Sequence, residues 1–333
     1  MKAIFLCEQP NQLRAVFDRE TIDGIGAIAE LDETIYNKEM LLASPDAFAD
    51  VVMIFSTWGM PPLTEEEIRR CLPSLQCLFY GAGSVQNFAR PFLACGVKVF
   101  SAWAANAVPV AEMTVAQIVL ANKGYFVSNR LYHASGRKEA KTAFKKCRGN
   151  YGETVGIIGA GMIGKLVIQM LKQYNLRVLV FDPFLSEERA DELGVEKCSL
   201  DELFARAFVV SNHLANNEQT KGMIQYDHFC RMRENAVFIN TGRGAQVVEE
   251  DLVRVLCERP DLTALLDVTD PEPPIYDHPF YTLPNCRLTP HIAGSAGDEV
   301  ARMGEYMLDE CKAYLNGKAC QYEVSMKMLE TMA

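Results

Sequence analysis

The sequence predicts an α/β fold of two doubly wound domains, one inserted into the other. Short apolar runs alternate with helical patterns along most of the 333 residues, as in parallel strands joined by crossover helices. A glycine-rich turn stands near the middle of the chain, at residues 159–164, although such a turn normally follows the first strand of its domain. The domain that this turn opens is therefore expected to interrupt a second, discontinuous domain.

The composition is that of an ordinary globular protein, with 49% hydrophobic and 23% charged residues and enough length for two cores. No apolar run approaches the roughly 18 residues of a membrane span. Residues 1–7 are too short for a signal-peptide core and are expected to form a first strand. The net charge of −10 argues against nucleic acid or an anionic membrane as the main partner.

The eleven cysteines are scattered along the chain without a C-x-x-C pair. Because the chain is large and shows no export signal, these residues are expected to be reduced thiols of a cytoplasmic protein. The same scatter gives no reason to expect a zinc site or another metal site.

The first hundred residues contain four apolar runs typical of parallel strands, at 3–7, 51–55, 75–80 and 97–100. Thr64, with Glu67 three residues later, predicts the start of a helix that continues through residues 68–72. Gly81, Ala82 and Gly83 follow the third run and form a candidate anion-binding turn.

A change of pattern follows near residue 104. Apolar residues recur with helical spacing from 108 to 119, which predicts a long buried helix with Pro109 in its first turn. Further strands are predicted at 154–158, 177–181, 208–211, 236–240, 262–268 and 286–289. From 297 onward the pattern is mostly helical, with no further strand-turn signature. We therefore predict a cofactor domain at 104–296 and a discontinuous domain at 1–103 and 297–333.

The turn at 159–164 is a G-x-G-x-x-G fingerprint in its expected setting, between a strand and the helical pattern of 165–174. Gly159 permits the tight turn, Gly161 permits close approach of a pyrophosphate, and Gly164 permits helix–strand packing. Met162 and Ile163 open the helix, whose free N–H groups would face the phosphates. The sequence therefore predicts a Rossmann-like domain that binds a dinucleotide.

Asp182 ends the next predicted strand and indicates which dinucleotide is bound. Its carboxylate is expected to accept hydrogen bonds from the adenosine ribose. A 2′-phosphate about 4 Å away would cost roughly 1–4 kcal/mol per charge pair, and no arginine follows in residues 183–186. NAD is therefore expected to bind about tenfold more tightly than NADP, or better. The alternative is a carboxylate that only caps the turn before Pro183.

Three later residues stand at or just beyond strand ends and are candidates for chemistry. Arg243 lies between two glycines and suits a carboxylate or a polarised carbonyl, although it could be a surface residue. His291 is a candidate general acid/base, or else a capping histidine. Glu272, in a proline-rich loop, is expected to orient His291 and favour its charged form, unless it is only a solvated loop acid. His213 follows another strand and is expected to line the cofactor site.

With Arg243, Glu272 and His291 in this order after the fingerprint, nearly the whole chain resembles the D-isomer-specific 2-hydroxyacid dehydrogenases. The segments that carry the resemblance are 240–244 around the arginine, 266–273 up to the glutamate, 290–294 around the histidine, the loop 81–83, and the linker helix with Asn106 and 110–112.

This resemblance implies a discontinuous substrate-binding domain, and a homodimer formed largely by the cofactor domains. It also implies that Thr241, Gly242, Asp267 and Gly294 contact NAD, with Asp267 bonded to the carboxamide. The sequence departs from the family pattern at Gly242, where a residue with a β-carbon is usual. It departs again at 215–217 and at 101–105, where usual proline-containing segments are replaced.

The implied activity is the NAD-dependent interconversion of a D-2-hydroxy acid and its 2-oxo acid. Arg243 and the amides of Gly81, Ala82 and Gly83 would hold the substrate carboxylate, while His291 would exchange the hydroxyl proton. Trp58 would favour an uncharged substrate side chain, or else only packs locally against the prolines that follow it. Two alternatives remain open: an NAD(H)-sensing protein like the corepressors of this fold, and a related enzyme of other chemistry, such as amino-acid or phosphite oxidation.

Overall fold

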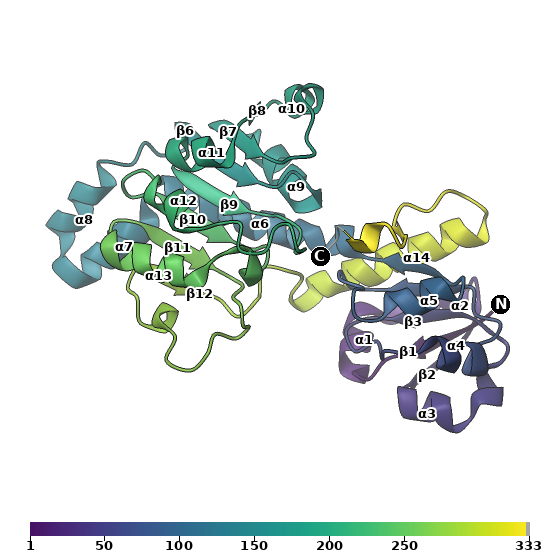
Figure 1. Ribbon diagram of the computed structural model, residues 1–333. Coiled ribbons are helices and arrows are strands. Elements are labelled where there is room, and N and C mark those ends of the chain that lie inside the picture. The colour runs from purple at the N-terminus through teal and green to yellow at the C-terminus, as the bar shows by residue number, and fades with distance from the viewer. Residues whose placement is uncertain (331–333) are drawn as a thin grey trace. The chain divides into compact units, whose positions relative to one another are not determined.

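The computed structural model describes residues 1–330 and divides the chain into two compact units. The first unit combines Met1–Asn106 with the C-terminal segment from Ser295, and the second is Ala107–Gly294. The chain leaves the first unit within helix α6 (Trp103–Asn122) and returns at Ser295. The middle of the chain, coloured blue-green to green in Figure 1, thus forms a unit of its own. The predicted class of two doubly wound α/β domains is confirmed.

The first unit is built on a six-stranded sheet in the order β13-β5-β4-β3-β1-β2, in which only β13 is antiparallel. Its strands are β1 (Lys2–Leu6), β2 (Glu30–Tyr36), β3 (Val51–Ser56), β4 (Cys77–Tyr80), β5 (Lys98–Ser101) and β13 (Glu323–Val324). The sequence pattern revealed four of these strands and missed two. Strand β2 is a polar edge strand with no buried residue, and β13 has only two residues. Strand β13 thus lies in the segment after 297, where the sequence shows no strand-turn signature.

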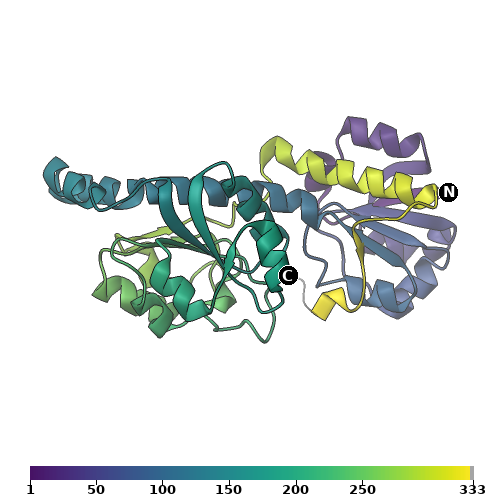
Figure 2. The same cartoon turned by 90° about the horizontal axis from the view of Figure 1, so that it is seen from above.

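Helices cover both faces of this sheet. Helix α14 packs against α1, α2 and the strands β4 and β5, whereas α4 packs against α5; Figure 2 shows α14 lying along one face. The capping box of Thr64 and Glu67 at the start of α4 is confirmed. The helices are α1 (Pro10–Val16), α2 (Arg19–Gly26), α3 (Lys38–Ala43), α4 (Glu65–Cys71), α5 (Ala89–Ala94) and α14 (Ala301–Leu315), with 3-10 turns at Pro45–Phe48, Gly297–Val300 and Met328–Glu330.

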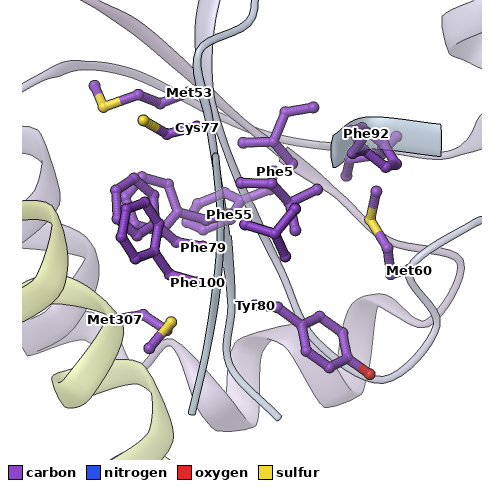
Figure 3. Packing of buried hydrophobic residues seen from close by; sticks show 14 of the residues in the cluster. Phe5, Met53, Phe55, Met60, Cys77, Phe79, Tyr80, Phe92, Phe100 and Met307 are labelled. Atoms are coloured by element: carbon purple, nitrogen blue, oxygen red, sulfur yellow. The ribbon is translucent and has the colours of Figure 1, made fainter. Parts of the chain in front are cut away.

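A row of phenylalanine rings forms the centre of the first core. Strand register places Phe55, Phe79 and Phe100 side by side on β3, β4 and β5. Their rings stack with centroids 5.0 and 4.8 Å apart, and Figure 3 shows this column with Met307 of α14 beside it. Buried aromatic rings contribute large apolar areas, so this column fixes α14, although α14 lies 200 residues away in the chain.

The second unit has a seven-stranded parallel sheet in the order β12-β11-β10-β9-β6-β7-β8. Because the order runs outward in both directions from β6, a switch point lies beyond the carboxyl end of this strand, where ligands bind in such sheets. The strands are β6 (Tyr151–Ile158), β7 (Asn175–Phe181), β8 (Glu196–Lys197), β9 (Val209–Asn212), β10 (Val237–Asn240), β11 (Thr263–Leu266) and β12 (Cys286–Leu288).

Helices also bury both faces of this second sheet. Val237 and Ile239 of β10 belong to a cluster with α6 and α9, while Phe238 between them faces a cluster with α11 and α13. The helices are α7 (Tyr125–Ser135), α8 (Arg137–Phe144), α9 (Met162–Leu171), α10 (Glu187–Leu193), α11 (Leu200–Arg206), α12 (Tyr226–Cys230) and α13 (Glu249–Glu258), with 3-10 turns η2 (Gly244–Gln246) and η3 (Pro279–Tyr281).

Helix α6 differs from its prediction in two respects. It begins at Trp103, so Pro109 lies in its interior and not in its first turn. It is also long and apolar enough to cross a membrane by length and composition, contrary to the expectation that no run reaches this length. More than half of its apolar stretch, 56%, is buried inside the protein. Ala111, Val115 and Ile118 pack on the sheet of the second unit, as in a core helix.

Gly304 allows α14 to approach the end of α1, and this contact gives a stability test. A β-carbon at position 304 would lie 2.1 Å from the carbonyl oxygen of Val16, whereas one at Gly26 would meet nothing within 4 Å. We expect Gly304→Ala to lower the free energy of unfolding by about 1–3 kcal/mol through overpacking. Gly26→Ala, the matched helical control, should change it by less than about 1 kcal/mol. Urea denaturation followed by circular dichroism measures both, and equal stability of the two variants would contradict the packing argument.

Candidate active site

The glycine fingerprint forms the turn between β6 and α9. Gly159 has φ +91°, and a β-carbon there would lie 2.9 Å from the carbonyl oxygen of His213. A β-carbon on Gly164 would lie 2.0 Å from the carbonyl oxygen of Gly159, whereas one on Gly161 would meet nothing within 4 Å. Gly159 and Gly164 are therefore required by the fold itself. The open space at Gly161, next to the helix start at Met162, fits the close approach of a pyrophosphate.

Asp182 follows β7 and forms a hydrogen bond with the backbone of the glycine turn. Its carboxylate accepts hydrogen bonds from the backbone N–H of Ala160, at 2.7 Å, and of Phe184, at 2.8 Å. The turn-capping role weighed for this residue is therefore present. Each carboxylate oxygen can accept more than one hydrogen bond, so the geometry also leaves acceptor capacity for ribose hydroxyls, a role that stays a prediction.

His291 and Glu272 are joined by a hydrogen bond, with 2.7 Å between His291 Nδ1 and Glu272 Oε1. Because Nδ1–H donates to the carboxylate, a neutral ring presents Nε2 as its proton acceptor. No other residue of the described chain forms a hydrogen bond with Nε2. The side chains are 45% and 38% exposed, so the free nitrogen is accessible to a small molecule. This arrangement can accept and return one proton.

Asp267, directly after β11, builds the turn that carries His291. Its buried carboxylate accepts from the Thr289 hydroxyl at 2.6 Å, and from the N–H groups of Ile292 and Ala293 at 2.9 Å each. Within this turn His291 has φ +53°, a left-handed conformation that is uncommon for residues other than glycine. Asp267 therefore maintains an unfavourable backbone conformation at His291. Its predicted bond to a carboxamide stays a prediction, as does the contact of Gly294.

Arg243 lies in the turn after β10, half-buried, with Nη1 donating to the carbonyl oxygen of Gly242 at 2.8 Å. Burial lowers the pKa of Arg243, and the negative charge of Glu272 acts in the opposite direction. An arginine stays protonated in proteins despite such a shift. A partly desolvated guanidinium that lacks an ion-pair partner in the described chain is a suitable binding group for a carboxylate.

Gly244 brings the glutamate loop to this turn. A β-carbon on Gly244 would lie 2.0 Å from the carbonyl carbon of Thr269, so only glycine permits the loop after β11 to pass here. Glu249 then accepts from the N–H of Asp270 at 2.8 Å, and burial raises the pKa of Glu249 to about 7. Both contacts hold the segment that leads to Glu272.

His213 is buried between hydroxyl groups rather than exposed at the strand ends. Its Nε2 lies 2.9 Å from Ser211 Oγ, and its Nδ1 lies 3.5 Å from Thr241 Oγ1, which in turn is 3.2 Å from Thr114 Oγ1. Burial lowers the pKa of His213 to about 3, so the ring is neutral. His213 and Thr241 thus lie beneath the site, and direct cofactor contacts by them stay predictions.

Asn212 and Gln246 are buried site residues that the sequence reasoning missed. Asn212 Nδ2 donates to Gln246 Oε1 at 2.5 Å and to Asn240 Oδ1 at 3.0 Å. The available signal was two amide residues within mostly apolar segments, 208–212 and 245–248. An amide in such a setting is expected to bond to neighbouring backbone.

The candidate substrate residues lie in the first unit. The N–H groups of Gly81 and Ala82 already donate to the carbonyl oxygens of Ser56, at 2.7 Å, and Tyr80, at 2.9 Å. None of the described residues accepts a hydrogen bond from the N–H of Gly83, which leaves it as the amide of this turn that can bind an anion. Trp58 is half-buried against the phenylalanine core. The anion-binding and substrate roles stay predictions.

The described residues contain no group of three histidine, cysteine, aspartate or glutamate side chains placed to hold a metal ion. All eleven cysteines are free thiols. Arg243 follows β10 in this unit, and Glu272 and His291 lie in the loops that follow β11 and β12; their catalytic roles stay predictions.

Comparison with known proteins identifies this arrangement. The sequence profile described as "D-isomer specific 2-hydroxyacid dehydrogenase, NAD binding domain" matches residues 117–293, which include the fingerprint and all three candidate catalytic residues. The chain belongs to the D-isomer specific 2-hydroxyacid dehydrogenase family. The resemblance inferred from the sequence is thus confirmed, and the second unit contains the family's NAD-binding domain.

Family relatives differ in what they act on. D-3-phosphoglycerate dehydrogenase of Archaeoglobus fulgidus is 30% identical over 237 residues, 71% of this chain and 44% of that protein. Glyoxylate reductase of Korarchaeum cryptofilum is 35% identical over 168 residues, 50% of this chain and 51% of that protein. The chain thus spans about half of the length of the relatives it matches. The solved D-mandelate dehydrogenase of Rhodotorula graminis is 19% identical with a TM-score of 0.80, covering 97% of each chain, which supports the fold alone.

The buried imidazole of His213 makes stability depend on pH. Its folded pKa of about 3 lies below the unfolded value of about 6.5, so between these values the unfolded state binds a proton that the folded state does not. Stability should therefore fall as the pH drops, by up to about 1.4 kcal/mol per unit. Urea denaturation from pH 6 to 4 should show a shallower decline for His213→Gln than for the parent protein; parallel profiles would contradict a buried neutral ring.

Proposed function

We propose that this protein interconverts a D-2-hydroxy acid and its 2-oxo acid with NAD as the hydride carrier. The observation that carries this proposal is the 2.7 Å pair of His291 and Glu272, close enough to Arg243 for the charge of Glu272 to act on its pKa. A proton donor, its orienting carboxylate and a partly buried cation are the groups that reduction of a carbonyl beside a carboxylate requires.

NAD would be held at the turn between β6 and α9, where Gly161 leaves open space and Asp182 retains acceptor capacity for the ribose. The hydride leaves or enters at the nicotinamide, and the protein supplies binding and orientation. The carboxylate of Asp182 disfavours a 2′-phosphate nearby, so NADH is expected to be preferred to NADPH.

Arg243 is proposed to bind the substrate carboxylate and to polarise the C2 oxygen, because its planar guanidinium can donate to both groups. In reduction, protonated His291 gives the proton on Nε2 to that oxygen. In oxidation, the neutral ring takes the hydroxyl proton at the same nitrogen. Glu272 holds Nδ1–H throughout and stabilises the imidazolium that forms.

The substrate side chain is proposed to be recognised by the first unit. Gly83 has an amide that can bind a carboxylate, and Trp58 offers a half-buried apolar ring. This combination favours a small 2-oxo acid with an uncharged side chain. Relatives are named for phosphoglycerate and for glyoxylate. Which 2-oxo acid this protein reduces is therefore determined by measuring activity on a panel of acids.

A homodimer through the cofactor domain is part of this proposal. Large apolar side chains stand exposed on two neighbouring helices of the second unit: Tyr125 and Tyr132 on α7, and Phe144 on α8. Helices α7 and α8 pack on each other. Exposed apolar groups gathered in this way favour a protein partner, here proposed to be a second copy of the chain.

A panel of 2-oxo acids tests the activity directly. Glyoxylate, hydroxypyruvate, pyruvate and branched 2-oxo acids are each mixed with the protein and NADH, and with NADPH in parallel, and the loss of nicotinamide absorbance is followed. We expect oxidation of NADH with at least one acid, and slower oxidation of NADPH. Tight NADH binding with no turnover on the whole panel would contradict the proposal and favour an NAD(H)-sensing protein.

Replacement of the proposed acid/base gives a sharper test with the acid found in that panel. His291→Ala should lower kcat by about 10²–10⁴-fold, the usual contribution of general acid/base catalysis. The Kd of NADH from fluorescence titration should stay unchanged, because His291 is not assigned to the cofactor. His133→Ala, which alters an exposed histidine on α7, is the matched control and should keep normal turnover. Near-normal turnover of His291→Ala would exclude this role.

The dimer is tested by charge introduced on its proposed face. Multi-angle light scattering should give twice the mass of one chain for the parent protein. The double variant Tyr132→Asp with Phe144→Asp should give the mass of one chain, because buried charge disfavours an apolar interface. Tyr276→Asp, at another highly exposed position of the same unit, should leave the dimer intact. Dissociation by the control, or a monomeric parent protein, would contradict the assigned face.

A further inference from the structure

Three buried amide side chains form a connected layer beneath the turn of Arg243. Asn212 ends β9, Asn240 ends β10, and Gln246 lies in η2; none of them is more than 1% exposed. Asn212 Nδ2 donates to Asn240 Oδ1 at 3.0 Å and to Gln246 Oε1 at 2.5 Å. Strand register places Asn212 and Asn240 directly side by side.

These amides hold the backbone on both sides of Arg243. Gln246 Oε1 accepts from the N–H of Arg243 at 3.2 Å, and Asn240 Nδ2 donates to its carbonyl oxygen at 3.1 Å. Asn240 Oδ1 also accepts from the N–H of Gly242 at 3.1 Å. The residue proposed to bind the substrate carboxylate is thus fixed at both of its peptide bonds by buried side chains.

The same layer holds the loop that follows β9. Gln246 Nε2 donates to the carbonyl oxygen of Leu214 at 2.7 Å, and Asn212 Oδ1 accepts from the N–H of Leu214 at 3.3 Å. The backbone of Gln246 itself accepts from the N–H of Ile224. Gln246 therefore joins two loops, the one that begins at His213 and the one that carries Arg243.

Gly242 belongs to this arrangement because the amides occupy the space where a side chain at position 242 would lie. A β-carbon at position 242 would lie 2.9 Å from Gln246 Oε1 and 3.1 Å from Asn212 Nδ2. The two amides thus occupy the space that a larger residue at 242 would need. This contact accounts for a glycine where the sequence resemblance leads one to expect a β-carbon.

A buried amide network of this kind is rigid because each group loses its hydrogen bonds if it moves, and an unpaired buried polar group is costly. In Gln246, Asn212 and Asn240 alike, both the amide oxygen and the amide nitrogen of the side chain form hydrogen bonds. A displacement of a catalytic group by about 1 Å can reduce the rate about 10²-fold. The placement of Arg243 should therefore depend on these amides.

We propose that the amides of Asn212, Asn240 and Gln246, packed against Gly242, act as one positioning unit, which sets the orientation of Arg243 toward the substrate carboxylate. They touch no reacting atom and act through Arg243. This inference rests on the proposed function, since it requires Arg243 to bind the 2-oxo acid.

The first measurement compares Gln246→Met with a matched control, using the acid and NADH. Methionine keeps the length of the side chain but removes its strong donor and acceptor, so kcat/KM should fall about 10- to 100-fold through misplacement of Arg243. The control, Asn285→Leu, removes another buried amide of the same unit, which donates to the carbonyl oxygen of Leu256 at 2.9 Å. Its kcat/KM should stay within about twofold although its Tm falls. An equal loss of kcat/KM in both variants would overturn the proposal.

A double-mutant cycle then separates positioning from general damage. In an Arg243→Lys background, adding Gln246→Met should lower kcat/KM by less than about threefold. The guanidinium that Gln246 positions is already absent from that background. The same full loss in both backgrounds would overturn the positioning role. Failure of the proposed function is recognised separately: Arg243→Lys alone would then retain normal kcat/KM.

Gly242→Ala is a second, milder variant that adds one methyl group and removes no hydrogen-bonding group. It should raise the KM for the 2-oxo acid and lower kcat about tenfold or more, since the β-carbon displaces the amides. In a Gln246→Ala background, which vacates the space, the added loss from Gly242→Ala should be at least about threefold smaller. A loss of the same size in both backgrounds would contradict the shared space.

Discussion

The level register of three neighbouring strands is the constraint on which the candidate site depends. Asn212 of β9, Asn240 of β10 and Leu266 of β11 are paired partners, so these three strands end side by side. The residues that follow them are His213, Thr241 and Asp267. A shift of one strand by one residue would reverse its side chains and would separate Arg243 from the loop of Glu272. Backbone pairing between these strands thus sets the positions of the candidate site residues, independently of contacts between their side chains.

At and directly beyond these strand ends the protein buries several polar side chains, and those described next have hydrogen-bond partners. Asp267 accepts three hydrogen bonds, His213 lies between two hydroxyls, and the amides of Asn212, Asn240 and Gln246 bond to one another. Such groups are costly when they lose a partner. These hydrogen-bonded polar groups therefore make the turns rigid, and Glu272 and His291 are more exposed than the groups beneath them.

Sequence patterns predicted the buried parallel strands well and the periphery poorly. Central strands such as β6 and β10 are short apolar runs, which periodicity detects. Strand β2 was missed because this edge strand is only half-buried at best and carries charged residues, and β13 because two residues form no pattern. The start of α6 was misplaced because Pro109 was taken as a first-turn residue. The link between Asn212 and Gln246 was missed because these two residues, which bond to each other, lie 34 residues apart in the sequence.

The sequence by itself determined the dinucleotide turn, the family, and the order of Arg243, Glu272 and His291 along the chain. Glycine spacing carries this information because the conformation of a tight turn is local. Only the tertiary structure decided that His291 adopts a left-handed conformation, that its Nδ1 meets Glu272, and that buried amides hold the backbone of Arg243. These features depend on strand register and on close approach between distant segments, as at Gly244 and Thr269, which no local pattern encodes.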